Sequence, residues 1–293
     1  MKMKKLIATA LLAVMTVSTL TACGGAQSDA NSDTKSKTKT AKVIDINLTD
    51  EEYAFGVDKT QPELLKEVNS FITEIKENGK FDEICNNYFG DGTPVAIQSA
   101  TYDDSKDQLV VATNAAFEPF EYTKGDDYYG IDMEIAKALA DKLGKELVIQ
   151  NMDFDAVCLS VGQQKCDTAM AGLTIKPDRE EYVTFSDPYY SAAQKLIVTS
   201  DDTEFDDCKT ADDVVAKLKE KDSSVTVGVQ TGTTGQFFCE GDKDWGFEGF
   251  AMKTTGYKNG SLAVQDLLNG NINYVVIDSA PAASITTAIN EMQ

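Results

Sequence analysis

Residues 108–150 read QLVVATNAAFEPFEYTKGDDYYGIDMEIAKALADKLGKELVIQ, and this stretch decides the fold class. Its pattern predicts a strand over 108–113, a loop rich in aromatic residues, a helix over 132–143 and a second strand over 146–150. A strand, a helix and a strand in this order favour a βαβ unit, in which the helix connects two parallel strands. We therefore expect an α/β fold with helices on the faces of a largely parallel sheet.

The alternation continues along the chain and begins again after a long strand over 194–200. The elements predicted after residue 150 are the helix 154–163, the strand 168–171, the long strand, the helix 211–220, the strand 225–229, a helix opened by QTGTTG, a strand near 250–254, the helix 261–268, the strand 274–277 and a helix after Pro281. Two α/β units joined by an extended strand predict two lobes with a cleft between them. Sheets of this kind bind ligands in crevices at the carboxyl ends of their strands.

The segment before residue 108 carries elements of its own. We expect strands over 42–46 and 53–57, a helix between Pro62 and Gly79, and a shorter helix over 81–88. The longer helix has one apolar stripe at three- and four-residue spacing, formed by Leu64, Leu65, Val68, Phe71, Ile72 and Ile75. Residues 91–107 show no clear period and are interpreted as a linker.

The first residues are typical of an export signal. Three lysines precede an apolar stretch over 6–20 that is too short for a membrane span, so residues 1–22 are interpreted as a signal peptide. The sequence LTACG at 20–24 resembles the lipobox of bacterial lipoproteins, in which the cysteine, here Cys23, is acylated and becomes the new N-terminus. The alternative is an ordinary cleavage site that happens to contain a cysteine. Residues 23–41 have almost no apolar side chains and are expected to form a flexible tether.

Composition excludes several classes of function. The formal net charge is −21, from 48 acidic and 27 basic residues, which argues against nucleic acid or an anionic membrane surface as a partner. Histidine is absent from the sequence, which removes the commonest general base and the commonest zinc ligand. We expect no metal, no cofactor and no catalysis.

Five cysteines remain besides Cys23, namely Cys85, Cys158, Cys166, Cys208 and Cys239. They form no CxxC pair, so the pattern gives little support to a metal site. An odd number outside the cell leaves at least one thiol free, even if disulfides form. Small buried residues are an equally good interpretation, and the pairing stays open.

Five segments in one order carry a resemblance to a known family. They are VATNAAFEPFEY followed by GIDMEIAKALADKLG, then NMDFDAV, AMAGLTIKPDREEYVTFSDPYY, VGVQTGTTG and NINYVVIDSAPA, which together span about 108–285. These segments resemble the type II periplasmic solute-binding proteins for polar amino acids that feed ABC importers. The resemblance implies a two-lobed binding protein with a hinge. It would be a monomer at the outer face of the cell membrane, and would bind an amino acid and deliver it to a permease.

Residues 49–90 also resemble this family, but they resemble its end. In ordinary members such a strand and long helix follow the second lobe, whereas here they precede everything and the chain stops at Gln293. The sequence therefore resembles a circular permutant, with 91–107 as the new join between the old ends. The alternative is a separate N-terminal module before a truncated receptor.

The permutation implies that lobe 1 covers 49–192 and lobe 2 covers 193–293. Lobe 1 would consist of the permuted elements at 49–90, the join at 91–107 and the family's N-terminal half at 108–192. A strand of lobe 2 and a hinge segment would lie at 42–48. The two crossings between lobes are expected at 194–199 and near 48–53. Ligand binding would favour a closed arrangement of the lobes around this hinge.

The resemblance also implies a ligand site for both charges of a free amino acid. Arg179 is expected to grip the carboxylate with its planar guanidinium, aided by Gly172 and Thr174. Asp278 is expected to take the ammonium; the alternative, a cap for the following helix, is compatible with that role. Thr233 and Thr234 offer backbone N–H groups at a helix start, which suit a carboxylate, although such a motif is often only a cap.

The side chain of the ligand is expected between Phe117 and Phe154, either of which could instead belong to the core. Many family members with cationic or amide ligands carry Asp at the position of Asn114. The neutral amide makes lysine, arginine or histidine a less suitable ligand and favours a polar neutral amino acid, cystine or glutamine. Two alternatives share the fold: a sensory receptor for amino acids, and a dehydratase acting on cyclised amino-acid precursors.

Overall fold

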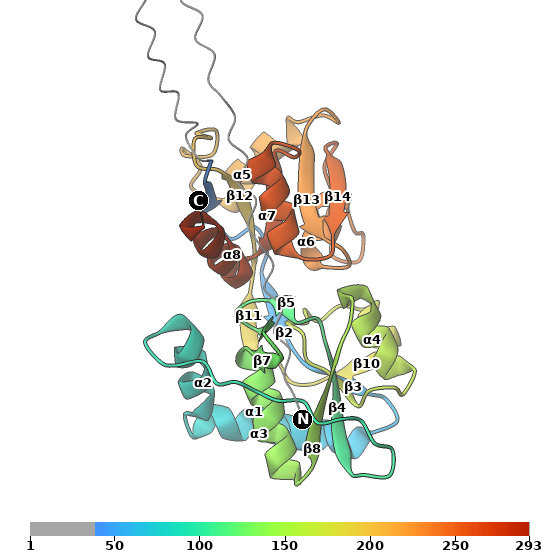
Figure 1. Cartoon of the computed structure of the whole chain (residues 1–293). Coiled ribbons are helices and arrows are strands. Elements are labelled where there is room, and N and C mark those ends of the chain that lie inside the picture. Colours follow the sequence, from blue (N-terminus) through green and yellow to red (C-terminus); the bar gives the residue numbers. More distant parts are fainter. Residues whose placement is uncertain (1–38, 293) are drawn as a thin grey trace, which may run out of the picture. The chain divides into compact units, whose positions relative to one another are not determined.

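A computed structural model of the chain describes residues 39–292. The predicted signal peptide, Cys23 and most of the predicted tether lie outside the described residues. These residues form two α/β lobes, each built around a five-stranded sheet (Figure 1). The α/β architecture with two lobes is therefore confirmed. No helix within 39–292 has the length and apolarity needed to cross a bilayer.

The sheet of lobe 1 has the strand order β10-β3-β9-β4-β8. Its strands are β3 (Gly56–Asp58), β4 (Gln108–Thr113), β8 (Glu146–Asn151), β9 (Thr168–Ala169) and β10 (Val183–Phe185). The opening stretch forms the predicted βαβ unit, because β4 pairs in parallel with β8 and α3 (Ile131–Leu143) connects them. Every side chain of β4 is buried, as expected for a central parallel strand.

Helices and two small sheets complete lobe 1. The helices are α1 (Pro62–Glu77), α2 (Lys80–Phe89), α4 (Phe154–Gly162) and the short 3₁₀ helix η1 (Arg179–Glu181). One small sheet pairs β2 (Glu51–Tyr53) with β11 (Tyr190–Ala192). The other contains β5 (Ala116–Phe117), β6 (Glu121–Lys124) and β7 (Asp127–Tyr129). In α1 the apolar stripe is confirmed, since Val68, Phe71, Ile72 and Ile75 are buried. Leu64 and Leu65 pack against the same core.

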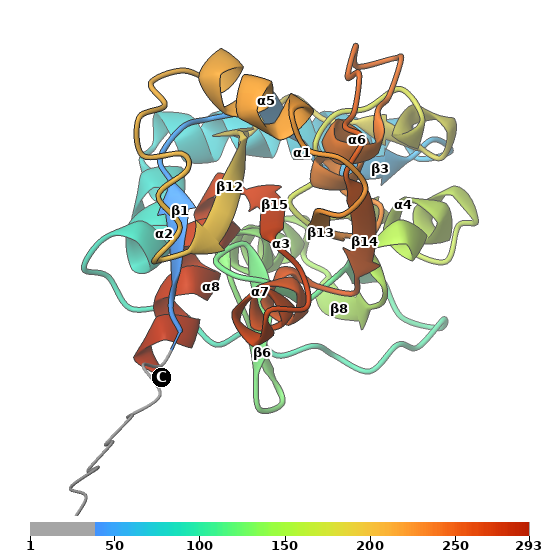
Figure 2. The same cartoon turned by 90° about the horizontal axis from the view of Figure 1, so that it is seen from above.

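The sheet of lobe 2 has the order β1-β12-β15-β13-β14 (Figure 2). Its strands are β1 (Ala41–Ile44), β12 (Gln194–Thr199), β13 (Thr226–Gln230), β14 (Lys253–Tyr257) and β15 (Tyr274–Asp278), and its helices are α5 (Ala211–Lys219), α6 (Thr234–Glu240), α7 (Gly260–Asn269) and α8 (Ser279–Glu291). β1 and β12 are antiparallel, whereas β13 pairs in parallel with both neighbours. The N-terminal strand thus belongs to the sheet of the C-terminal half.

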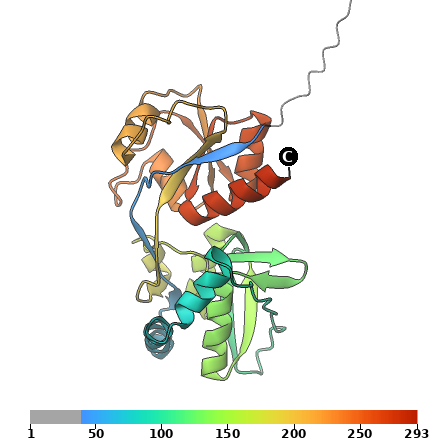
Figure 3. The same cartoon turned by 90° about the vertical axis from the view of Figure 1, so that its left-hand side faces the viewer.

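Two segments of the chain connect the lobes (Figure 3). One runs from β1 to β2 through residues 45–50, and the other is Ala193, between β11 and β12. They are bonded to each other, because the Leu48 N–H donates to the Gln194 carbonyl (2.9 Å) and the Gln194 N–H donates to Thr49 Oγ1 (2.8 Å). We refer to residues 45–50 and Ala193 as the connecting segments.

Several element boundaries differ from the predictions. The predicted strand 53–57 is two strands, β2 and β3, because the chain changes its pairing partner at Ala54 and Phe55. The strand expected near 250–254 forms at Lys253–Tyr257, beside β13. The last helix begins at Ser279, ahead of Pro281, since proline lacks only an N–H that the first helical turn does not use.

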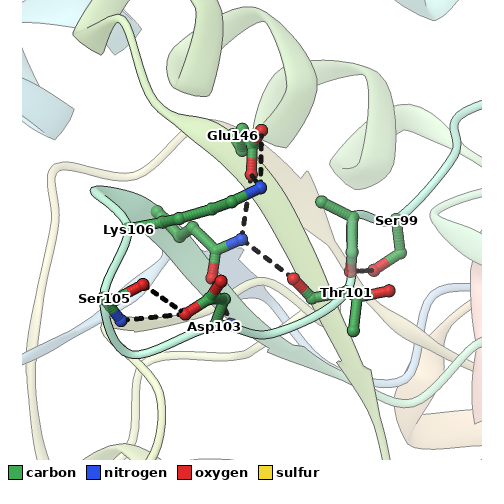
Figure 4. A network of polar contacts seen from close by, with 8 residues as sticks. Ser99, Thr101, Asp103, Ser105, Lys106 and Glu146 are labelled. Carbon is green, nitrogen blue, oxygen red and sulfur yellow. Dashed lines mark hydrogen bonds and ion pairs between the residues drawn. The ribbon is translucent and has the colours of Figure 1, made fainter.

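The predicted linker 91–107 is held in place by side chains. Gln108 Nε2 donates to the Thr101 carbonyl (2.9 Å) and to Glu146 (3.1 Å), and Lys106 forms an ion pair with Glu146 (3.1 Å) (Figure 4). The Ile149 N–H donates to Ser99 Oγ (2.8 Å). This segment therefore follows the edge strand β8, although it has no periodic pattern of its own.

Candidate functional site

The predicted site residues follow the carboxyl ends of strands in both lobes. In lobe 1, Asn114 and Phe117 follow β4, Phe154 opens α4 after β8, and Gly172, Thr174 and Arg179 follow β9; in lobe 2, Thr233 and Thr234 follow β13, and Asp278 ends β15. One hydrogen bond between the lobes joins two of these positions, Thr234 and Thr174, and others join Arg179, Asn114 and Asp278 to residues outside the predicted set. The structure therefore brings together residues that are far apart in the sequence.

Arg179 lies where the two lobes meet. Its Nη1 donates to the Thr174 carbonyl (2.6 Å) in its own lobe, and its Nη2 donates to the Gly232 carbonyl (3.2 Å) in the other. The guanidinium carbon is 5.2 Å from the centre of the Phe154 ring, an arrangement typical of a cation–π contact. A guanidinium has five N–H donors, so donors remain for a carboxylate.

The two threonines at the start of α6 make different contacts. Thr233 occupies the N-cap position, but its hydroxyl donates back to the Gln230 carbonyl (2.8 Å) and makes no capping bond. The Thr234 hydroxyl donates to Thr174 Oγ1 in lobe 1 (3.2 Å). Both residues are buried, and Thr234 adds a second bond between the lobes.

Asp278 is a buried carboxylate that receives a bond from the other lobe. The Tyr53 hydroxyl donates to its Oδ1 over 2.6 Å. Although Asp278 occupies the N-cap position of α8, its side chain makes no capping bond, so the helix does not account for the carboxylate. Burial raises the pKa of Asp278 and the Glu51 carboxylate raises it further, while bonds from Tyr53 and Gln194 lower it.

Sequence reasoning missed Glu51, which lies beside Asp278. Glu51 is buried and accepts bonds from Thr174 Oγ1 (2.7 Å), Thr49 Oγ1 (2.5 Å) and Gln194 Nε2 (3.0 Å). Thr174 lies in lobe 1, Thr49 lies in a connecting segment, and Gln194 is the first residue of β12. The segment EEY gave only a strand pattern, and nothing local indicated that its first glutamate meets residues more than 120 positions away.

Glu121 and Asp132 are two further buried carboxylates that the sequence did not single out. Glu121 is fully buried, and neither carboxylate oxygen has a hydrogen-bond partner among the described residues. Burial raises its pKa well above the ordinary value, and Asp132 and Asp278 add to the effect. Burial also raises the pKa of Asp132 to about 7, although the Gly172 N–H (2.9 Å) and the Tyr189 hydroxyl (2.6 Å) donate to it.

Glu51, Glu121, Asp132 and Asp278 are four of the six carboxylates buried within 39–292, and they share one property with the other two, Asp58 and Glu134. Within 39–292, none of them forms an ion pair with a lysine or an arginine of the chain. Burying negative charge without a cation is costly, and at Glu121, Asp132 and Asp278, whose pKa values burial raises, the arrangement favours either protonation or a bound cation.

Asn114 and Phe117 follow β4 in lobe 1, and both are buried. Asn114 Nδ2 donates to the Met152 carbonyl (2.7 Å), and its Oδ1 accepts from Gln230 Nε2 in lobe 2 (3.0 Å). Phe117 is buried against Gly172, whose φ is +53°. A Cβ at residue 172 would lie 2.9 Å from Phe117 Cε1, so both the backbone and the space require glycine there.

A cavity of about 200 Å³ adjoins Arg179 between the lobes. Its lining includes Phe154, Leu173, Lys176 and Arg179 of lobe 1, and Gly232 and Phe237 of lobe 2. The described residues contain no cluster of side chains suited to a metal ion. All five cysteines within the described part are free of disulfides.

Comparison with known proteins agrees with this arrangement. Residues 109–280 match the family described as bacterial extracellular solute-binding proteins, family 3. The arginine-binding extracellular protein ArtP of Bacillus subtilis (strain 168) is 32% identical over 191 residues, which cover 65% of this chain and 69% of that protein. ABC transporter arginine-binding protein 1 of Escherichia coli (strain K12) is 28% identical over 175 residues, or 59% of this chain and 64% of that protein, less than two thirds of its length.

Solved structures with related folds include reconstructed ancestral proteins. The ancestral amino acid-binding protein AncCDT-1, a precursor of cyclohexadienyl dehydratase, has a TM-score of 0.53 and 30% identity, and the match covers 62% of this chain and 75% of that one. An ancestral arginine-binding protein bound to glutamine has a TM-score of 0.51 and 32% identity, with 62% and 74% covered. The chain therefore belongs to the bacterial extracellular solute-binding proteins, family 3.

Proposed function

We propose that this protein binds a free amino acid between its lobes and delivers it, as a monomer, to an ABC importer. The ligand's carboxylate binds Arg179 and its ammonium binds Asp278. One observation supports the proposal: the Arg179 guanidinium donates to the Thr174 carbonyl, and the Thr174 hydroxyl donates to Glu51, a buried carboxylate whose charge acts on Asp278. This charge pattern is complementary to a zwitterion. The names of the relatives, which include ABC transporter binding proteins, support the transport role.

The first test concerns Arg179. Arg179→Ala should weaken amino-acid binding by about a hundredfold or more, because a buried charge partner of the carboxylate is lost. Isothermal titration calorimetry measures the affinity, and circular dichroism checks that the variant is folded. Unchanged affinity in a folded variant would contradict the assignment of the site.

We propose a polar, uncharged side chain for the ligand, as in glutamine or cystine. Asn114 supports this, because its neutral amide is buried and, among the described residues, has hydrogen bonds to two neutral groups, the Met152 carbonyl and the Gln230 side chain. The ancestral arginine-binding protein solved with glutamine shows that a related site accepts a neutral amide.

A cationic amino acid is the second candidate, and Glu121 favours it. Its carboxylate is buried without a hydrogen-bond partner among the described residues, so a ligand cation would supply the missing contact. Relatives named as arginine-binding and histidine-binding proteins agree with this candidate. An arginine side chain would ionise Glu121 on binding, whereas glutamine would leave it protonated.

Proton release distinguishes these ligands. Titrations with glutamine, cystine, arginine and histidine in buffers of different ionisation enthalpy report how many protons leave the protein on binding. If arginine is the ligand, the number of protons released on binding should fall by about one in Glu121→Gln. If the ligand has a neutral side chain, glutamine or cystine should bind tightly, and Glu121→Gln should release as many protons as the wild type. Turnover of a cyclised amino-acid precursor would instead favour the dehydratase alternative.

We also propose that Cys23 is acylated after export and holds the protein at the outer face of the cell membrane. The sequence LTACG supports this proposal, and the predicted tether, 23–41, would end just before Ala41, which belongs to β1 instead. Metabolic labelling with a fatty-acid analogue should mark the wild-type protein and leave Cys23→Ser unlabelled. Equal labelling of the two proteins would contradict it.

Finally, we propose that the chain is a circular permutant of its family, with lobe limits at 49–192 and 193–293, the strand and hinge segment at 42–48 and a join at 91–107. The positions of β1 in the lobe 2 sheet and of β2 and β3 in lobe 1 support this, since they precede the residues 109–280 that match the family. The contacts that hold the join in place agree with it: the Val95 N–H donates to Glu134 (3.1 Å) and Ile97 pairs with Tyr128.

A further inference from the structure

We propose that Lys176 is a positioning residue that holds the two lobes together and thereby sets the affinity for the ligand. Lys176 follows β9 in lobe 1, three residues before Arg179. Its Nζ forms an ion pair with Asp242 of lobe 2 (3.0 Å) and lies 4.5 Å from the centre of the Phe237 ring, also in lobe 2. Only 1% of the side chain is exposed, which is rare for a lysine.

The environment of Lys176 explains why the charge is tolerated there. Besides Asp242, Lys176 pairs with Asp178 on its own loop, and it faces the aromatic ring of Phe237. Asp242 is itself mostly buried, with 14% of its side chain exposed. A desolvated pair with an added cation–π contact is worth more than a surface ion pair.

The contacts of Lys176 differ between a closed and an open arrangement of the lobes. Separation of the lobes would break the contacts to Asp242 and Phe237 and leave only the pair with Asp178. The lobe 2 contacts therefore stabilise the closed form selectively. Because ligand affinity falls in proportion to the closed population, the lobe 2 contacts of Lys176 can set this affinity in addition to any contact that Lys176 makes with a ligand in the cavity it lines.

A second lysine gives a matched control. Lys258 of lobe 2 also forms an ion pair across the lobes, with Asp153, over 3.4 Å. Its side chain is 75% exposed and that of Asp153 is 64% exposed, so water and salt screen this pair. The two lysines make the same kind of connection, one buried and one in solvent.

The chain also carries a spectroscopic reporter at this position. Trp245 is the one tryptophan of the sequence, and its backbone N–H donates to Asp242 Oδ1 (3.3 Å). Its fluorescence therefore reports on the turn that receives Lys176. This readout works without a ligand, so it separates the role of Lys176 from the proposed function on which the affinity argument rests.

The experiment compares Lys176→Met, Asp242→Asn, Lys258→Met and the double variant Lys176→Met/Asp242→Asn, in which the exposed Asp178 is the one carboxylate that loses its pair with Lys176. Without ligand, both variants at position 176 should show increased acrylamide quenching of Trp245 and a larger radius of gyration in X-ray scattering. With arginine and glutamine as the probes, they should bind about tenfold more weakly, as expected for loss of a charge-assisted contact. Lys258→Met should match the wild type in all three measurements.

Three results would overturn the proposal: wild-type quenching and dimensions in Lys176→Met, equal effects of the two lysine variants, or losses from Lys176→Met and Asp242→Asn that simply add in the double variant. If the wild type binds neither probe but the quenching changes as expected, Lys176 keeps its role and the proposed ligands fail.

Discussion

At the residue scale, Gly172 shows how backbone and side-chain constraints meet in this site. Its positive φ is disfavoured for other residues, and the Phe117 ring occupies the space that a Cβ would need. Its N–H also donates to Asp132. One small residue therefore positions an aromatic wall and a buried carboxylate.

Gly172→Ala should destabilise the protein by about 2–4 kcal/mol, from the left-handed backbone and the contact with Phe117 together. Gly125→Ala is the matched control: its φ is +64° but a Cβ there meets nothing within 4 Å, so only about 1–2 kcal/mol is expected. Chemical denaturation measures both variants. Equal losses would show that the Phe117 contact is unimportant.

The raised pKa of Asp278 predicts a pH dependence. Between its ordinary pKa of 3.8 and its raised native value, the folded protein holds a proton that the unfolded chain has lost. This group therefore lowers stability as pH rises through that window. An ammonium ligand needs the ionised carboxylate, so affinity should rise with pH over the same window.

Calorimetry from about pH 5 to about pH 8 tests this dependence, with Asp278→Asn as the control that should reduce it. The Asp132 carboxyl, whose pKa is also raised, stays in the variant and contributes equally to both proteins. A wild-type affinity independent of pH would argue against a contact between Asp278 and the ligand ammonium.

At the element scale, the helix starts of this protein differ in whether a side chain caps them. In α5 the start is a complete capping box: the Thr210 hydroxyl accepts from the Asp213 N–H (3.2 Å), and the Asp213 carboxylate accepts from the Thr210 N–H (2.9 Å). In α6 and α8, the N-cap side chains of Thr233 and Asp278 make no capping bond. Asn259 also caps α7, but the starts of α1 and α4 lack a side-chain capping bond too, so a missing cap is not confined to α6 and α8.

Thr210→Ala should cost about 1 kcal/mol of stability without altering ligand affinity. Because the two capping bonds are reciprocal, the loss in Thr210→Ala/Asp213→Ala should be smaller than the sum of the single losses. The exposed neighbour Asp212 in the same turn is the control, and Asp212→Ala should cost only a few tenths. Additive losses in thermal denaturation would contradict the reciprocal cap.

At the scale of the whole molecule, the N-terminal and C-terminal halves are interleaved. β1 lies beside β12 and contacts the last helix, where Asn290 accepts from the Ala41 N–H (2.9 Å) and donates to the Ala41 carbonyl (2.8 Å). The first and last described elements are therefore neighbours, which is the geometry that a rewired chain requires.

A protein with residues 39–90 moved behind residue 292, through a short Gly/Ser linker, tests the permutation. We expect it to fold with a melting temperature within a few degrees of the original and to bind the same ligand equally well, because all sheet pairings are kept. The original chain with an equal linker inserted after residue 90 controls for the added residues. Failure of the rearranged chain alone to fold would contradict the proposal.

Much of the fold could be predicted because its signals are local. The βαβ unit at 108–150 and the stripe of α1 follow from hydrophobic period, which depends only on neighbouring residues. The strand at 53–57 was predicted as one element, because a period-2 pattern does not record a change of pairing partner. The family resemblance supplied Arg179 and Asp278 as candidates, and their roles remain predictions.

The sequence by itself determined the α/β class, the two lobes and most of the helices and strands, since these depend on patterns within a few turns of chain. Only the tertiary structure decided which polar groups meet: Tyr53 with Asp278, 225 positions apart, Asn114 with Gln230, and Lys176 with Asp242. It also revealed that Glu121 is buried without a hydrogen-bond partner among the described residues. These contacts depend on how the whole chain is arranged in three dimensions. A hydrophobic period describes neighbouring residues and carries no information on the distance between two side chains far apart in the sequence.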